Sequence, residues 1–147
     1  MERKGIIRIH IIASIISFST ILIFFSMSLF AEINGNEGLI KNVKRNILVG
    51  LPLMIITMPA LAITGKKLAG KSQNILILIK QKRMKFILAN GILLILLAGF
   101  LYYYSHYIAL NTTFLIFQLL EFFCGLANLT MIGMNIKDGI QLSHKRE

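Results

Sequence analysis

The feature that most constrains this chain is an uncharged apolar run of 21 residues, IIASIISFSTILIFFSMSLFA, from Ile11 to Ala31. About 20 consecutive apolar residues in a helix cross a hydrocarbon core about 30 Å thick. Three similar runs follow over 47–64, 86–104 and 114–136, and the last contains one charged residue, Glu121. The sequence therefore predicts an all-α integral membrane protein whose 147 residues form one membrane domain, a bundle of four transmembrane helices.

The placement of the basic residues predicts an orientation. The chain has 16 Lys and Arg against 6 Asp and Glu, and thirteen of the basic residues fall in the N-terminal segment, the 65–85 loop and the C-terminal tail. The opposite side carries three, namely Lys41, Lys44 and Arg45. Because cytoplasmic loops are enriched in Lys and Arg, we expect both termini in the cytoplasm of a multi-pass protein of the bacterial inner membrane.

A short stretch in the basic loop matches a nucleotide-binding motif. GKKLAGKS, from Gly65 to Ser72, fits G-x-x-x-x-G-K-[ST]. A phosphate-binding loop follows a buried strand and needs an acidic partner for magnesium, whereas a proline-containing apolar run precedes this one and no acid lies between Glu37 and Glu121. We expect no nucleotide site: Gly65 should end the second helix, Gly70 should turn the chain, and Ser72 should cap the next helix.

The remainder of this loop, ILILI followed by KQKRMK, predicts a short interfacial helix that continues into the third span. Its basic side chains would contact anionic lipid headgroups: Lys80, Lys82, Arg83 and Lys85. The alternative is binding of nucleic acid or of a calmodulin-like protein. Because the charges flank apolar runs, we expect a lipid bilayer as partner and no nucleic acid.

Glu121 is the most informative single residue. A charge at mid-bilayer costs about 2.5–3.5 kcal/mol or more, so its side chain should face protein. Spacings of three, four and seven place it on one helix face with four other polar or small residues: Gln118, Gly125, Asn128 and Asn135. This face should point into the bundle, where Thr57, a serine of the first span or the tyrosines at 102–104 are candidate partners of Glu121.

A second polar cluster is expected at the cytoplasmic mouth of the bundle, formed by His10, Asn90 and Asn135. His10 is also a candidate haem ligand, but His106 lies at the opposite face and His144 in the tail, so no histidine pair exists at membrane depth. The single cysteine, Cys124, excludes an internal disulfide and a cysteine-based zinc cluster. We expect neither a cofactor nor a metal.

Two pairs of glycines, each eight residues apart, predict close packing of the third and fourth spans: Gly91 with Gly99, and Gly125 with Gly133. Pro52 and Pro59 predict kinks in the second helix.

Several stretches together resemble a group of small four-helix bacterial inner-membrane proteins of uncharacterised activity. They are LFAEINGN (29–36), VKRNILVGLPL (43–53), ITGKKLAG (63–70), RMKFILANG (83–91) and LEFFCGLANLTMIGMNIKDG (120–139). The resemblance implies a Gram-negative inner membrane and no particular activity. The chain is also similar in architecture to the small multidrug-resistance transporters, four-helix dimers with an essential membrane glutamate; theirs lies in the first helix, whereas Glu121 lies in the fourth.

Three functions remain open at this point. The polar stripe and the glycine faces favour a non-enzymatic accessory subunit or assembly factor that acts through helix contacts, in a homodimer or a larger membrane complex. The alternative is a small proton-coupled transporter in which Glu121 titrates. A haem or redox subunit built around His10 is the third hypothesis.

Overall fold

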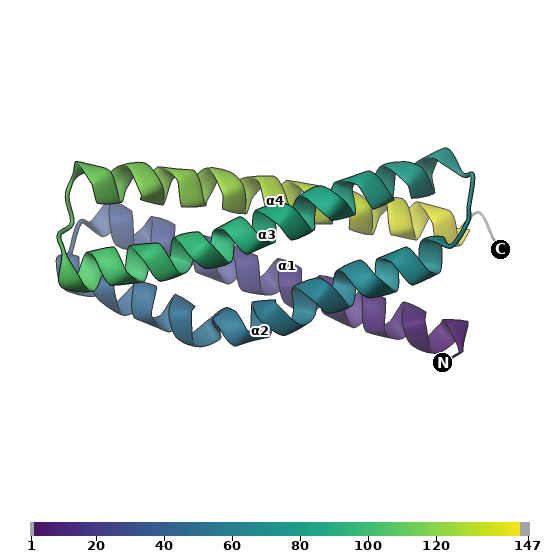
Figure 1. The fold of residues 1–147 in the computed structure, drawn as a ribbon, viewed down its shortest axis with the longest axis horizontal. Helices are drawn as coiled ribbons and strands as arrows, with labels where there is room; N and C mark the ends of the chain where they lie inside the picture. The colour runs from purple at the N-terminus through teal and green to yellow at the C-terminus, as the bar shows by residue number, and fades with distance from the viewer. Residues whose placement is uncertain (1, 145–147) are drawn as a thin grey trace.

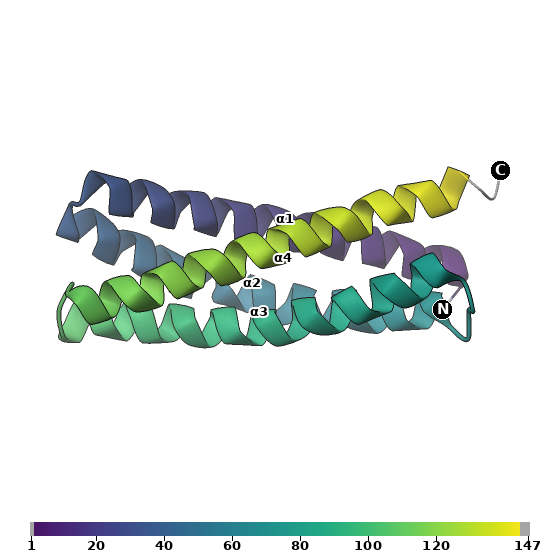
Figure 2. The ribbon, with the colours of Figure 1, turned by 90° about the horizontal axis from the view of Figure 1, so that it is seen from above.

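The computed structural model describes residues 2–144, which form four antiparallel α-helices. They are α1 (Arg3–Asn34), α2 (Glu37–Ala69), α3 (Ile75–Tyr107) and α4 (Thr112–His144). Both α1 and α3 pack on α2 and on α4, so α2 and α4 face each other across the diagonal of the bundle (Figures 1 and 2). The termini and the 70–74 turn lie at one end, here called the termini end, and the two other turns lie at the hairpin end.

The chain reverses direction at turns built by asparagine and glycine. Asn36, Asn74 and Asn111 each accept a hydrogen bond from a backbone N–H in the first turn of the following helix. Gly35 and Gly70, with φ of +65° and +53°, end α1 and α2 in a conformation that side chains disfavour. These local signals fix where each helix starts and stops.

All four helices are long and apolar enough to cross a membrane. Each has 32 or 33 residues, about 48–50 Å at about 1.5 Å per residue, so each exceeds a hydrocarbon core of about 30 Å. Large apolar side chains point outward along every helix, for example Ile12, Ile56, Leu96 and Phe123. The predicted all-α bundle of four such helices is confirmed.

The segment between the second and third spans differs from the expectation. Helix α2 continues to Ala69 and α3 begins at Ile75, so most of the expected loop over 65–85 is helical. The predictions that Gly65 ends a helix and that Ser72 caps the next are wrong: Gly65 lies inside α2, and Asn74 is the cap. The motif from Gly65 to Ser72 is thus a helix end and a turn, preceded by a helix instead of a strand.

The glycines predicted to bring the third and fourth spans together mostly accommodate side chains of the other two helices: the nearest neighbours are Met58 at Gly91, Phe25 at Gly125 and Phe18 at Gly133, and Gly99 has none within 4 Å. A Cβ at Gly91 would lie 2.9 Å from Cε of Met58, and one at Gly125 would lie 3.3 Å from the Phe25 ring. A Cβ at Gly65 would meet His10 and Met84, both at 3.2 Å, so the absent side chain of Gly65 accommodates these neighbours. Helix α2 passes through its two prolines, which lie on its exposed face, and bends near its middle (Figure 1).

Candidate functional site

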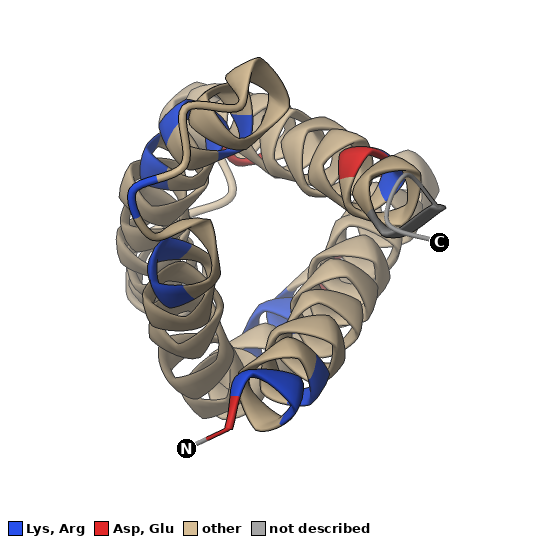
Figure 3. Cartoon of the chain, turned by 90° about the vertical axis from the view of Figure 1, so that its right-hand side faces the viewer, with Lys and Arg blue, Asp and Glu red and all other residues tan. Residues whose placement is uncertain are grey.

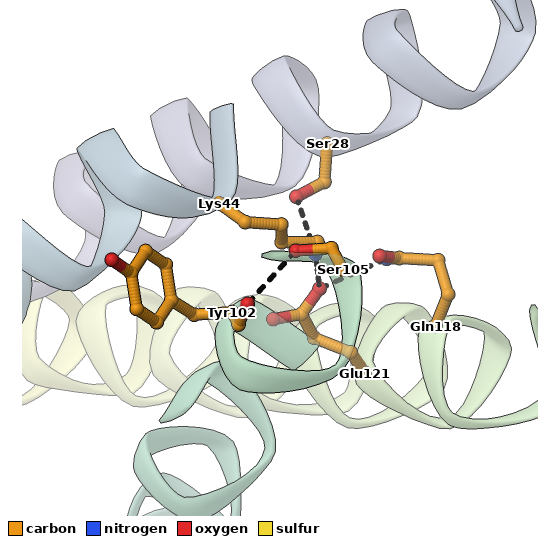
Figure 4. A network of polar contacts seen from close by, with 6 residues as sticks. All are labelled: Ser28, Lys44, Tyr102, Ser105, Gln118 and Glu121. Carbon is orange, nitrogen blue, oxygen red and sulfur yellow. Dashed lines mark hydrogen bonds and ion pairs between the residues drawn. The ribbon is translucent and has the colours of Figure 1, made fainter. Parts of the chain in front are cut away.

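A network of charged and polar side chains lies inside the bundle (Figure 4). Its members Ser28, Lys44 and Glu121 lie in the halves of α1, α2 and α4 that are nearer the hairpin end. Nζ of Lys44 lies 2.5 Å from Oε2 of Glu121 and donates to Oγ of Ser28 at 3.2 Å. Nε2 of Gln118 donates to the same Glu121 oxygen at 2.9 Å. The network therefore ties α1, α2 and α4 together at a single point.

The ion pair at the centre of this network is buried. The side chains of Lys44 and Glu121 are 1% and 11% exposed. Because α2 and α4 lie on a diagonal, the extended lysine side chain crosses the interior of the bundle to reach the carboxylate. Each charge compensates the other, and removing either one would leave an uncompensated charge in an apolar interior.

A small cavity adjoins this ion pair, and a wider cleft lies farther toward the hairpin end. A cavity of about 40 Å³ is lined by all four helices, with Ser28 and Glu121 as its polar groups, and exceeds the ~10–15 Å³ that one water needs. At the hairpin end, a wider cleft of about 510 Å³ lies between the two turns and is lined by Glu32, Glu37 and Asn111 among others. Glu32, which lines this cleft, interacts electrostatically with both Lys44 and Glu121.

A second polar layer lies halfway along the bundle, between α3 and α4. Nδ2 of Asn90 donates to Oδ1 of Asn128 at 2.9 Å and to the carbonyl of Cys124 at 2.7 Å. Asn128 in turn donates to the carbonyl of Ile87 at 3.4 Å, and its side chain is fully buried. These bonds join the two helices.

A third polar layer lies toward the termini end. Arg83 forms an ion pair with Asp138 at 2.8 Å and donates to Oδ1 of Asn135 at 3.1 Å. Separately, Nδ1 of His10 lies 2.9 Å from Oγ1 of Thr64, which joins α1 to α2. The structure thus divides the predicted mouth cluster: His10, Asn90 and Asn135 each bond to a different partner.

The face of α4 that the spacing predicts is turned into the bundle. Gln118 and Asn128 are fully buried, and Gly125 and Asn135 are buried as well. Of the partners considered for Glu121, a serine of the first span does join the network, through Lys44. The buried hydroxyl of Thr57 has no hydrogen-bond partner.

The four basic residues assigned to lipid headgroups separate into two pairs. Lys82 and Lys85 are exposed, so headgroup contact stays a prediction for them. Arg83 is bonded to Asp138 and Asn135, and Nζ of Lys80 lies against Gly139, 3.1 Å from where its Cβ would be. Their half-buried positions give these two side chains protein neighbours.

Sequence reasoning missed Lys44 and Asp138. The charge count places Lys44 with Lys41 and Arg45 in the connection between the first two spans, whereas the structure places it inside α2. Its spacing contains the missing signal: Ile40, Lys44, Ile47 and Leu51 follow one another at intervals of four, three and four, and all are buried. Asp138 lies three residues after Asn135, on the continuation of the predicted face.

The chemistry available at these sites is that of proton or cation binding. Among the described side chains, those of residues 2–142, no three His, Cys, Asp or Glu gather as a metal ion would require. His10 and His106 lie near opposite ends of the bundle. No family model, curated protein or solved structure matches the chain, so its function has to be argued from this geometry.

Proposed function

We propose that this protein is a multi-pass protein of the bacterial inner membrane with both termini in the cytoplasm. Four long apolar helices with apolar outer faces support the membrane location. Basic residues gather at the termini end (Figure 3), which supports the orientation. Lys145 and Arg146, which belong to the same count of cytoplasmic charges, lie outside the described residues.

This placement puts the ion pair near the outer boundary of the hydrocarbon core. Lys44 lies seven residues from the start of α2, and Glu121 lies nine residues from the start of α4. At about 1.5 Å per residue, both are about 10–14 Å from the hairpin end, which is where a centred core of about 30 Å begins. The 510 Å³ cleft would then open toward the periplasm.

Within this membrane protein, we infer that the Lys44–Glu121 pair binds and releases a proton, and that the protein is a small non-enzymatic proton-coupled transporter. The observation that carries this proposal is the burial of the pair across the diagonal of the bundle, next to a cavity. Well-packed apolar residues are often as stabilising as a buried ion pair. Ionisable residues within transmembrane helices are rare and often mark functional sites, so a functional role explains the pair better than stability.

The proposed cycle follows from charge balance. When one proton from solution binds the Glu121 carboxylate, the carboxylate becomes neutral and the Lys44 ammonium loses its counter-ion. The tie between α2 and α4 weakens, which allows the two helices to move apart. Release of the proton restores the pair and closes the bundle.

The alternative role, an accessory subunit acting through helix contacts, has less support from this geometry. The features that favour it are the polar stripe of α4 and the glycine faces of the third and fourth spans, and most of these residues are packed within the chain. Side chains of Met58 and Phe25 occupy the space beside Gly91 and Gly125, and Asn90 donates to Asn128, whereas Gly99 has no neighbour within 4 Å of its Cβ position. The remaining outer surface is apolar and suits lipid.

The test is a pH step applied to the purified protein in liposomes on a solid-supported membrane. Proton binding within the membrane should give a transient current above that of empty liposomes. The variant Lys44→Gln/Glu121→Gln keeps polar side chains without charge, and it should fold and give no such current. A wild-type current equal to that of this variant, together with a stoichiometric partner in a pull-down from native membranes, would support the accessory role instead.

A further inference from the structure

Glu32 lies on α1 one helical turn beyond Ser28, which bonds to Lys44, and it lines the cleft at the hairpin end. The residue is partly buried near the end of α1. Its Oε1 atom is buried and has no hydrogen-bond partner. A buried acceptor without a partner is uncommon in proteins, and at a carboxylate it marks a place where a proton or a donor can bind.

The charges around Glu32 make this carboxylate part of the site. It interacts with Lys44 on α2 and with Glu121 on α4, and Glu37 is the other titratable group lining the cleft. The cleft residues from the turn before α4 and from its start, from Leu110 to Leu115, include no titratable side chain. Two carboxylates and one ammonium leave this group with a net charge of −1, which one proton neutralises.

Glu37 lines the same cleft but differs in its surroundings. Its side chain is 74% exposed and forms an ion pair at 3.8 Å with Lys41, four residues along the same helix. It has neither a buried unpartnered oxygen nor a described contact with the Lys44–Glu121 pair. Glu37 is therefore a matched control for Glu32.

We propose that Glu32 is a relay residue that takes a proton from the cleft, passes it to Glu121, and then becomes the new partner of Lys44. This proposal rests on the proton-binding role proposed above for Glu121. One proton leaves the water of the cleft and binds Glu32; it then moves to Glu121, and Glu32 is ionised again. The Lys44 ammonium keeps its protons throughout and pairs with whichever carboxylate is charged.

The exchange of partners has a structural consequence. With Glu121 ionised, Lys44 links α2 to α4 across the diagonal. With Glu32 ionised and Glu121 neutral, the same ammonium links α2 to α1, its neighbour along the first hairpin. Protonation of Glu121 would thus replace the ion pair between α2 and α4 by one between α2 and α1. The bundle would then open on the α4 side.

The test measures the rate at which the purified protein in detergent takes up protons after a rapid pH drop, using a pH-sensitive dye. Glu32→Gln should slow the uptake assigned to Glu121 by about 10²-fold, the scale of a positioned proton-transfer group. Glu37→Gln should change it less than about twofold, because an exposed glutamate is replaced by solvent water as a donor. Thermal unfolding should be nearly unchanged in both variants, since Glu32 has no side-chain hydrogen bond to lose.

The outcomes separate this proposal from the one on which it rests. If the wild type takes up no more protons than Lys44→Gln/Glu121→Gln, proton binding by Glu121 is wrong, and the relay is wrong with it. If the wild type takes up the proton and Glu32→Gln does so at the same rate, the relay alone is overturned. Equal slowing in the Glu32 and Glu37 variants would show a general effect of cleft charge and would also overturn the relay.

Discussion

Nζ of Lys44 meets Oε2 of Glu121 at 2.5 Å across the diagonal of the bundle, and the two helices that carry them pack on α1 and α3 instead of on each other. An ion pair between neighbouring helices would only strengthen an existing contact. This one is the direct link between α2 and α4 near the hairpin end, and both of its members are nearly excluded from solvent. Protonation of either member of the pair would therefore change the attraction that links α2 to α4.

Removing the lysine should destabilise the protein strongly. Lys44→Met leaves the Glu121 carboxylate buried without a counter-ion, and breaking a buried pair in this way costs about 3–5 kcal/mol. Thermal unfolding of the purified protein in detergent, followed by circular dichroism, measures the effect. Lys44→Met/Glu121→Leu, which removes both charges, should recover most of the lost stability.

Lys41→Met is the matched control for this prediction. Lys41 lies one turn before Lys44, and its ion pair with Glu37 is exposed, so its loss should change stability by less than about 1 kcal/mol. Equal destabilisation by the two methionine variants would contradict the assignment of Lys44 to the interior.

The asparagine layer should contribute measurable stability. Asn128→Ala removes two hydrogen bonds between α3 and α4, and we expect a loss of about 1–2 kcal/mol in unfolding free energy. Thr130→Ala is its control, because that exposed hydroxyl bonds only to the Leu126 carbonyl of its own helix. Unfolding in increasing sodium dodecyl sulfate compares the two variants. A loss of stability in Asn128→Ala no larger than that in Thr130→Ala would contradict the claim that the asparagine hydrogen bonds stabilise the packing of α3 on α4.

Two glycines should respond in opposite directions to alanine. A Cβ at Gly50 would lie 2.6 Å from Cζ of Phe24, so Gly50→Ala has to displace the ring and should cost about 1–3 kcal/mol. Gly99 has nothing within 4 Å of its Cβ position, so Gly99→Ala should stabilise α3 by about 0.5–1 kcal/mol. Melting temperatures that fall in both variants, or rise in both, would contradict the packing described.

The proposed orientation predicts a labelling pattern. In a Cys124→Ala background, Asn36→Cys places a thiol at the hairpin end and Gln73→Cys places one at the termini end. A membrane-impermeant maleimide added to intact spheroplasts should label Asn36→Cys and leave Gln73→Cys unlabelled until the cells are lysed. The reverse pattern would place the termini outside the cytoplasm.

Much of this fold could be predicted from the sequence because it depends mainly on long apolar runs, which can be read directly from the residues. Uncharged runs such as Ile11–Ala31 have to be helical in an apolar environment, and the spacing of Gln118, Glu121 and Asn128 indicates which face of α4 turns inward. The positions of the helix ends were harder to predict from the sequence. Gly65 looked like a helix terminator, but its conformation is helical and its small size serves packing against His10.

The pairing within the site could not be predicted in the same way. Lys44 looked like a loop charge because its neighbours are polar, and only the helical phase from Ile40 to Leu51 distinguishes it. Its partner lies 77 residues away, and which helices meet across the diagonal depends on the packing of the whole bundle. The same holds for Arg83, whose pairing with Asp138 follows from how α3 and α4 align.

The most direct test of the central claim is an infrared difference spectrum of the purified protein between neutral and acidic pH. The other Asp and Glu side chains of the chain also contribute to the protonated-carboxyl band at acidic pH. The account predicts that this band is larger in the wild type than in Lys44→Gln/Glu121→Gln by the contribution of Glu121, and that Glu37→Gln retains that contribution. The same band in wild type and double variant would show that Glu121 does not take up a proton, and the Lys44–Glu121 pair would then be a structural tie.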